Sequence, residues 1–150
     1  MAEYQYKTAS IGGHLQRSNI SDISSQLLDK MKASIDEGGA EGLRPLSVAF
    51  EGGRMEAFDA RNNPYTAQRI EYALLTRRDP SRWELDAHSG VNTWPELDAR
   101  DGAVIDEHEA DEWHLIGYYR GLNSATDQKA PFSDAIWDSV AVFTRRASPQ

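Results

Sequence analysis

Residues 20–37 read Ile-Ser-Asp-Ile-Ser-Ser-Gln-Leu-Leu-Asp-Lys-Met-Lys-Ala-Ser-Ile-Asp-Glu and carry the clearest pattern in the chain. Apolar residues recur there at steps of three and four, at Ile20, Ile23, Leu27, Met31 and Ile35. This spacing predicts one amphipathic helix with a single buried stripe. Ser21 or Asp22 can cap its start. Gly38-Gly39 suit its end, because a helix commonly stops at a glycine with positive φ.

Alternating residues on both sides of this helix predict strands. Residues 3–11 place Tyr4, Tyr6 and Thr8 on one face, and residues 44–50 alternate in the same way. Period-two alternation of aromatic, β-branched and other apolar residues is typical of strands. Gly52-Gly53 suits a tight hairpin, so we expect a returning strand over residues 55–61.

The rest of the chain repeats this mixture of strands and helix. Alternation over residues 69–77 favours a strand, although the spacing of Ala67, Ile70 and Leu74 leaves a helix open. Strands are also expected over residues 83–88, 113–120 and 140–145. Between them, Thr93 and Pro95 suit a helix start, Gly102 is expected to interrupt the segment, and residues 103–110 suit a short helix.

Two stretches 70 residues apart resemble each other. Residues 35–41, Ile-Asp-Glu-Gly-Gly-Ala-Glu, match residues 105–111, Ile-Asp-Glu-His-Glu-Ala-Asp, and each leads into a strand. We therefore predict a single α+β domain in which two β-α-β-β halves, residues 1–62 and 68–146, share one core. The expected architecture is an antiparallel sheet with both helices on one face and a ferredoxin-like pseudo-twofold axis. Chance matching of common residues remains the alternative.

The same segments resemble a family of small uncharacterised bacterial domains. Those domains open with a Tyr-rich strand and run a helix into a Gly-Ala-Glu-Gly-Trp-Glu-Leu motif. Here Tyr4-Gln5-Tyr6-Lys7 and Gly39-Ala40-Glu41-Gly42 are similar to that pattern, and the second half offers Ala110-Asp111-Glu112-Trp113. The first half lacks the Trp, and the second half lacks the glycines. The resemblance implies a β-α-β-β topology that could occur twice in this chain. It implies no known activity.

Composition excludes several classes of protein. The chain has 150 residues, a net charge of −8, 39% hydrophobic residues and no Cys. Direct binding to nucleic acid is not expected, because phosphate contacts need clustered Lys and Arg. Without Cys there is neither a thiolate metal site nor a disulfide framework. No membrane span or signal peptide is expected, which favours a cytoplasmic protein. Nucleotide-binding and hydrolase motifs are missing, so no cofactor is predicted.

The most unusual segment is the loop at residues 121–138, which is long and carries apolar residues. Loops of this length in compact domains are often functional. We predict a ligand-binding region formed by aromatic residues and one Arg, namely Trp113, Tyr118, Arg120, Phe132 and Trp137. The alternative is that the loop covers the edge of the sheet.

Two functions are expected from these patterns. The first is a non-enzymatic binding module for a small ligand or a basic protein partner, such as an acidic inhibitor, because the charge of −8 favours basic partners. The second is a small-molecule isomerase or hydrolase with His114 or His88 as general base. Either His14 or His88, each near a strand end, could pair with a carboxylate such as Asp86 or Glu84. No metal site is predicted, because the segment at His108 and Glu112 fails the His-Glu-x-x-His pattern. A pairing of His108 with Glu112 one helical turn later, which could bind metal or move protons, is the alternative to a solvated acidic helix end. Assembly into a homo-oligomer is left open.

Overall fold

A computed structural model describes residues 3–13, 20–36, 42–123 and 131–147. The elements in chain order are β1 (Tyr4–Gly13), α1 (Ile20–Asp36), β2 (Leu43–Phe58), β3 (Pro64–Arg78), β4 (Trp83–Asn92), α2 (Trp94–Ala110), β5 (His114–Leu122), the 3₁₀ turn η2 (Phe132–Asp134) and β6 (Trp137–Arg146). The protein is therefore α+β with more sheet than helix, as predicted.

The strands form two separate antiparallel sheets. The first has the order β1-β3-β2 and the second the order β4-β6-β5. The central strands are β3 and β6, each the last of its three strands in chain order, and each pairs with both of the others. The single sheet with both helices on one face that we expected from the sequence does not form.

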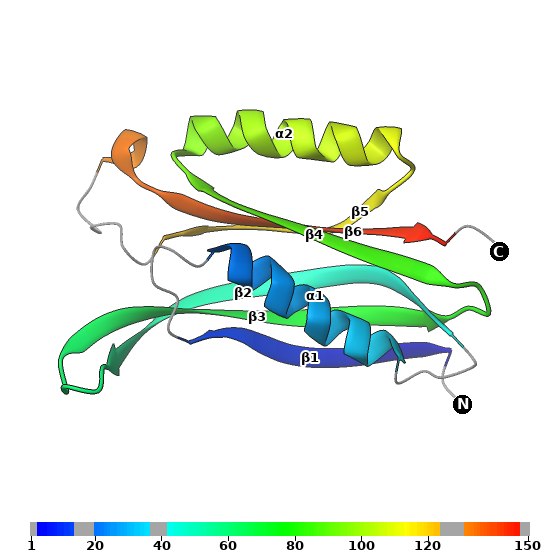
Figure 1. The fold of residues 1–150 in the computed structure, drawn as a ribbon, viewed down its shortest axis with the longest axis horizontal. Coiled ribbons are helices and arrows are strands. Elements are labelled where there is room, and N and C mark those ends of the chain that lie inside the picture. Colours follow the sequence, from blue (N-terminus) through cyan, green and yellow to red (C-terminus); the bar gives the residue numbers. More distant parts are fainter. Residues whose placement is uncertain (1–2, 14–19, 37–41, 124–130, 148–150) are drawn as a thin grey trace.

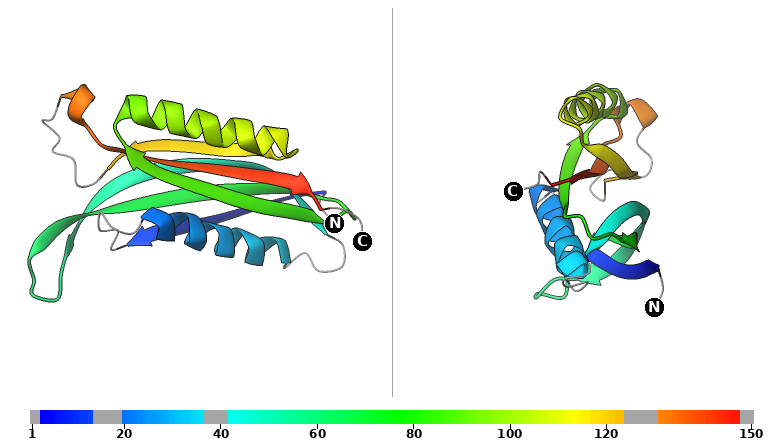
Figure 2. Two further views of the ribbon diagram at one scale, coloured as in Figure 1. Left: turned by 45° about the horizontal axis from the view of Figure 1, so that its top comes forward. Right: turned by 90° about the vertical axis from the view of Figure 1, so that its right-hand side faces the viewer.

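The elements are stacked in layers. Figure 1 shows α2 above the second sheet and the first sheet below it, with α1 in front of the first sheet. The two views in Figure 2 agree that α2 covers the face of the second sheet turned away from the first sheet, whereas α1 lies along one flank of the molecule, beside both sheets. Strand β6 is consequently covered on both faces, and all residues from Asp138 to Thr144 are buried.

The hydrophobic core lies where α1 and the two sheets meet. Leu27 and Met31 of α1 are fully buried, as the helical stripe predicted. They pack with side chains from both sheets, namely Val48, Ile70, Tyr72, Leu74, Leu85, Val140 and Val142. Ile35 is partly buried against this cluster. The side chains of Ile20 and Ile23, and the glycines 38 and 39, lie outside the described residues.

Most predicted elements are confirmed, and the choice left open at residues 69–77 is decided. That segment belongs to β3, which is a strand along its whole length. Strands at residues 3–11, 83–88, 113–120 and 140–145 are confirmed with longer bounds. Trp137, which we expected in the loop, begins β6.

The hairpin predicted at Gly52-Gly53 is wrong. Residues 43–58 form one continuous strand, and the chain reverses at residues 59–63 instead. The turn there uses Asn62, whose φ of 64° lies in the left-handed region, and the Asp59 carboxylate accepts the backbone N–H groups of Arg61 and Asn63. Figures 1 and 2 show this hairpin extending beyond the other strands.

Glycines instead allow β2 to approach β5. A Cβ atom on Gly52 would lie 1.7 Å from the hydroxyl oxygen of Tyr119, and one on Gly117 would lie 2.7 Å from the carbonyl oxygen of Val48. Both distances are far below van der Waals contact. The two glycines, Gly52 on β2 and Gly117 on β5, therefore allow the two sheets to pack closely against each other.

The expected interruption of the second helix at Gly102 is also wrong. Helix α2 continues through Gly102, since a single Gly inside a helix costs only about 1 kcal/mol relative to Ala. The position is open, with nothing within 4 Å of the place where a Cβ atom would stand. The helix begins after Thr93, as predicted, with Pro95 in its first turn. Thr93 makes no side-chain capping bond, but its backbone N–H donates to Asn92 Oδ1 over 2.8 Å.

The order β-α-β-β occurs twice along the chain. Strand pairing groups β1, β2 and β3 with α1, and β4, β5 and β6 with α2, so the strands divide between Arg78 and Trp83. The predicted halves divided earlier, between residues 62 and 68. The difference arises because residues 64–78 complete the first sheet, whereas we expected them to open the second half.

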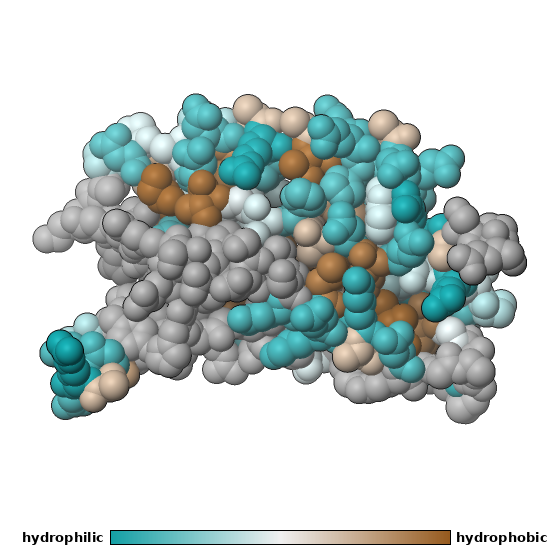
Figure 3. Space-filling model, in the orientation of Figure 1, coloured by the Kyte–Doolittle hydropathy of each residue, from teal (hydrophilic) through white to brown (hydrophobic). Residues whose placement is uncertain are grey.

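The surface is largely polar on the side drawn in Figure 3. Hydrophilic side chains cover most of the described part of this face, and hydrophobic ones gather in small patches between the layers. Neither described helix is both long and apolar enough to cross a membrane.

Candidate functional site

Four of the five predicted ligand-binding residues lie together at the start of α2. We call this group the Arg120 cluster; it contains Trp94, Tyr118, Arg120, Phe132 and Trp137. The ring centroids of Trp94 lie 5.5 Å from Phe132 and 4.9 Å from Trp137. The Arg120 guanidinium lies 4.4 Å from the Trp94 ring centroid. Trp94 was missed by sequence reasoning, because only the packing of α2 on β5 and β6 brings it here.

Arg120 is almost fully engaged by neighbouring side chains. Its Nη1 donates to Asp98 over 2.6 Å and its Nη2 lies 3.3 Å from an Asp101 carboxylate oxygen. Its Nε and Nη2 also donate to the Tyr118 hydroxyl, which in turn donates to Asp101 over 2.5 Å. Only 10% of the Arg120 side chain is exposed. These bonds fasten β5 to α2 and leave the guanidinium with little capacity for a ligand.

The same contacts affect the Tyr118 hydroxyl. Burial of the ring is the largest cause that raises the pKa of Tyr118 to about 12, and the hydrogen bond to Asp101 adds to this effect. Tyr118 is therefore neutral at physiological pH and serves as a donor to the aspartate. Whether the Arg120 cluster also binds a ligand stays a prediction.

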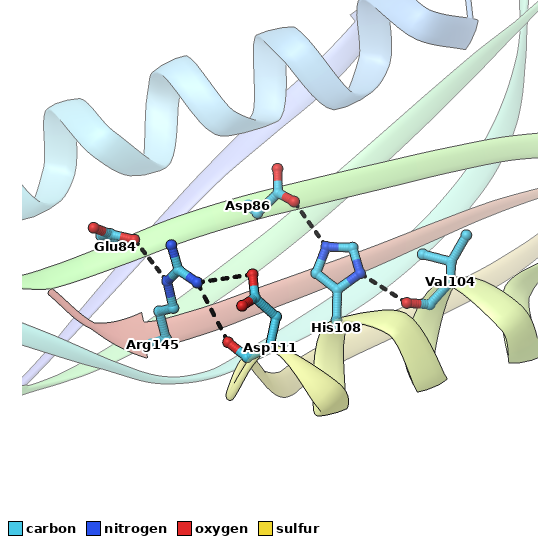
Figure 4. A network of polar contacts seen from close by, with 6 residues as sticks. All are labelled: Glu84, Asp86, Val104, His108, Asp111 and Arg145. Atoms are coloured by element: carbon cyan, nitrogen blue, oxygen red, sulfur yellow. Dashed lines mark hydrogen bonds and ion pairs between the residues drawn. The ribbon is translucent and has the colours of Figure 1, made fainter. Parts of the chain in front are cut away.

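The fifth residue, Trp113, lies at the opposite end of α2. It precedes β5, and its ring centroid is 6.0 Å from that of His108. The Arg145 guanidinium lies 4.3 Å from the Trp113 centroid. Figure 4 shows that Arg145 is held in turn by Glu84 and Asp111, with Nε–Oε2 and Nη1–Oδ2 distances of 2.9 and 3.0 Å.

Of the histidines considered as general bases, His88 lies in a polar cluster and His114 does not. His114 is the first residue of β5 and is exposed. His88 is also exposed, but its ring centroid lies 5.3 Å from that of His108. His14 lies outside the described residues.

His108 pairs with Asp86 and not with Glu112. Helix α2 ends at Ala110, and Glu112 follows with a φ of 65°, so the helical spacing between the two residues is lost. His108 Nε2 instead lies 2.8 Å from Asp86 Oδ2, and Nδ1 lies 2.7 Å from the carbonyl oxygen of Val104 (Figure 4). The ring stacks on Phe143 at a centroid distance of 3.8 Å. Sequence alone could not show this pairing, because the residues are 22 positions apart.

A cavity of about 840 Å³ lies between α1 and the end of the second sheet where β4 begins. Its lining comes from α1, from the turn and start of β4, and from the end of β6: Lys32, Ile35, Asp36, Ser81, Arg82, Trp83, Glu84, Leu85, Trp113, Arg146 and Ala147. Volumes of about 300–1,000 Å³ are usual for small-molecule sites. Trp113 is the one predicted ligand-binding residue that lines it.

Comparison of the chain with protein-family models, with curated proteins and with solved structures found no match.

Proposed function

We propose that this protein is a non-enzymatic binding module whose ligand is a small anion carrying a flat ring. The ligand would occupy the cavity between α1 and the second sheet. One observation carries the proposal: in a chain with a net charge of −8, this cavity is lined by three cationic side chains and two Trp residues.

The charges of the lining favour an anion. Lys32, Arg82 and Arg146 have no ion pair within the described part of the chain. Of the two acidic residues in the lining, Glu84 is already paired with Arg145 over 2.9 Å. Cationic groups gathered in a cleft concentrate the electrostatic potential there and attract anions. Arg side chains also offer paired donors that match carboxylates and phosphates.

The two Trp residues favour a ligand with a flat ring. Trp83 has the Arg44 guanidinium 4.4 Å from its centroid, and Trp113 has that of Arg145 at 4.3 Å. These contacts restrain both indole rings before any ligand arrives. Stacking of an aromatic ligand on a Trp side chain contributes about 1–3 kcal/mol where such contacts have been measured with nucleic-acid bases.

The proposal can be tested with probes that separate the charge from the ring. AMP carries both, adenosine carries the ring alone, and inorganic phosphate carries the charge alone. We expect AMP, or another ringed anion such as FMN or naphthalene sulfonate, to stabilise the protein against heat more than adenosine or phosphate does. A ligand at 100 times its Kd adds about 2.7 kcal/mol to the free energy of unfolding.

Variants assign the binding to the cavity. Trp113→Leu and Arg146→Gln should weaken binding of the same probe, whereas Arg61→Gln, an exposed Arg in the β2–β3 turn, should not. Native mass spectrometry of protein purified from its host would show a natural ligand directly. The proposal fails if no ringed anion binds and no small molecule copurifies, or if the three variants behave alike.

Our alternative function is a small-molecule isomerase or hydrolase. One observation favours it, the position of His88 beside His108 and Asp86, which could exchange a proton with a substrate. Loss of a measured turnover in His88→Ala, with the fold retained, would replace the binding proposal with this one. Binding to a basic protein partner also remains a prediction, supported by the net charge alone.

We further propose that the two β-α-β-β halves arose by duplication. Both sheets place the final strand of their half in the centre. In addition, β3 ends in Leu75-Thr76-Arg77-Arg78 and β6 ends in Phe143-Thr144-Arg145-Arg146, which supports an equivalence of these two strands. A ferredoxin-like pseudo-twofold relation between the halves stays a prediction.

A further inference from the structure

We propose that Asp86, His88 and His108 form a binding site for one divalent transition-metal ion of the zinc class. Each residue offers one ligand atom, and the three atoms lie within 4.8 Å of one another. The site is separate from the cavity described above, so neither proposal depends on the other.

The fold explains how these residues come together. Asp86 and His88 are two positions apart on β4, so both side chains point to the same face of the second sheet. Helix α2 covers that face and brings His108 from its last turn. Strand β4 lies at the edge of the sheet, and His88 is exposed there, so an ion can reach the site from solvent.

The ligand types fit the ion. Two imidazoles and one carboxylate are a common ligand set for zinc, with the remaining coordination position open to water. The same set with open positions also suits iron(II), so the proposal concerns a class of metal and not one element. Ligand atoms about 2.0–2.1 Å from a tetrahedral ion lie about 3.4 Å from one another. The exposed His88 ring can close the remaining distance by rotating about its side-chain bonds.

His108 is already oriented as a metal ligand. A carbonyl oxygen can only accept a hydrogen bond, so Nδ1 must carry the hydrogen that it donates to Val104 over 2.7 Å. This bond leaves Nε2 as the coordinating atom, and such a bond to a carbonyl or carboxylate is the usual support for a metal-bound His. Stacking on Phe143 holds the ring plane.

Asp86 completes the arrangement. Its Oδ2 lies 2.8 Å from Nε2, so the two ligand atoms already face each other. A metal ion would bind between them, because carboxylate oxygens and imidazole nitrogens are zinc ligands. Only 11% of the His108 side chain and 37% of the Asp86 side chain are exposed, so the ion would be partly shielded from water.

Cobalt(II) and zinc(II) are suitable probes for this site. We expect one Co²⁺ ion per chain, with visible d–d absorption that added Zn²⁺ removes. His88→Ala and His108→Phe should each weaken Zn²⁺ binding by more than about 100-fold, since loss of an outer-shell partner alone commonly costs 10–100-fold. His108→Phe keeps an aromatic ring on Phe143, and His88 is exposed, so these variants are expected to fold. His114→Ala, which removes an exposed His outside the cluster, is the matched control.

Nitrogen NMR of the zinc-loaded protein gives a reading that is independent of affinity. The His108 Nε2 resonance should shift to that of a metal-bound nitrogen, while Nδ1 keeps its hydrogen. The proposal is wrong if no saturable binding of Zn²⁺ or Co²⁺ occurs, or if His88→Ala and His108→Phe bind these ions as tightly as the unmodified protein. It is also wrong if His114→Ala loses as much affinity as they do.

Discussion

Replacement of Gly117 by Ala tests the packing that joins the two sheets. The added methyl carbon would lie 2.7 Å from the carbonyl oxygen of Val48 and 2.9 Å from the Val48 Cβ atom. Ordinary contacts between such atoms are about 3.5 Å, so β2 and β5 would have to separate by roughly 0.7 Å. Overpacking of this kind typically costs about 1–3 kcal/mol of stability.

Gly102→Ala is the matched control, because it makes the same chemical change where the structure leaves open space. Gly102 is exposed and lies inside α2, where Ala is more favourable than Gly by about 1 kcal/mol. We therefore expect Gly117→Ala to destabilise the protein and Gly102→Ala to stabilise it, with about 2–4 kcal/mol between the two variants.

Urea denaturation followed by Trp fluorescence measures both changes on one scale. In a domain of this size each kcal/mol corresponds to about 2–4 °C in Tm, so thermal unfolding should rank the variants in the same order. Unchanged or increased stability in Gly117→Ala would refute close packing of β2 on β5. A loss of stability in Gly102→Ala would refute a continuous α2.

Four further outcomes follow from burial and hydrogen bonding. Leu27→Ala should cost about 2–5 kcal/mol in the free energy of unfolding, because Leu27 is fully buried in the core; a cost below 1 kcal/mol would place α1 outside the core. Tyr72→Phe should leave stability unchanged or raise it by about 1 kcal/mol, since the Tyr72 hydroxyl is buried without a hydrogen-bond partner among the described residues; a loss of stability in chemical denaturation would contradict this. Because burial raises the pKa of Tyr118 from its usual 10.0 to about 12 in the folded state, the unfolded chain loses this proton first as pH rises. Stability should therefore fall between about pH 10 and 12 and not below, and the decline should be smaller in Tyr118→Phe. Phe132→Ala should cost about 1 kcal/mol or less, because the ring is 61% exposed, and should leave binding in the cavity intact; loss of binding on titration would move the ligand site to the Arg120 cluster.

Local sequence patterns predicted element types well where a single periodicity dominated. The stripe of α1 and the alternation in β3 each depend on burying one face, a requirement that acts within the element. Bounds and turns were less predictable. Gly52-Gly53 fits a tight turn as readily as a close contact between strands. The contact between Gly52 and the Tyr119 side chain, 67 positions later in the chain, shows that the second is what occurs.

The candidate sites show the same division. Aromatic residues and one Arg near the long loop indicated that five residues belong together: Trp113, Tyr118, Arg120, Phe132 and Trp137. Four of them do lie together, but Trp113 lies at the opposite end of α2. The sequence could not show that Asp98 and Asp101 neutralise Arg120, because that depends on the side of β5 against which α2 packs.

By itself, the sequence determined the α1 helix, most of the strands, the acidic charge and the missing Cys chemistry. Periodicity and composition act over short distances and need no knowledge of neighbours. The tertiary structure alone decided that the strands divide into two sheets, and that α1 packs against both of them while α2 packs on the second sheet alone. It also decided that His108 meets Asp86 and His88, and that Trp83 and Trp113 face one cavity. These contacts join residues far apart in the chain, and they exist because each sheet must bury its apolar face against another element.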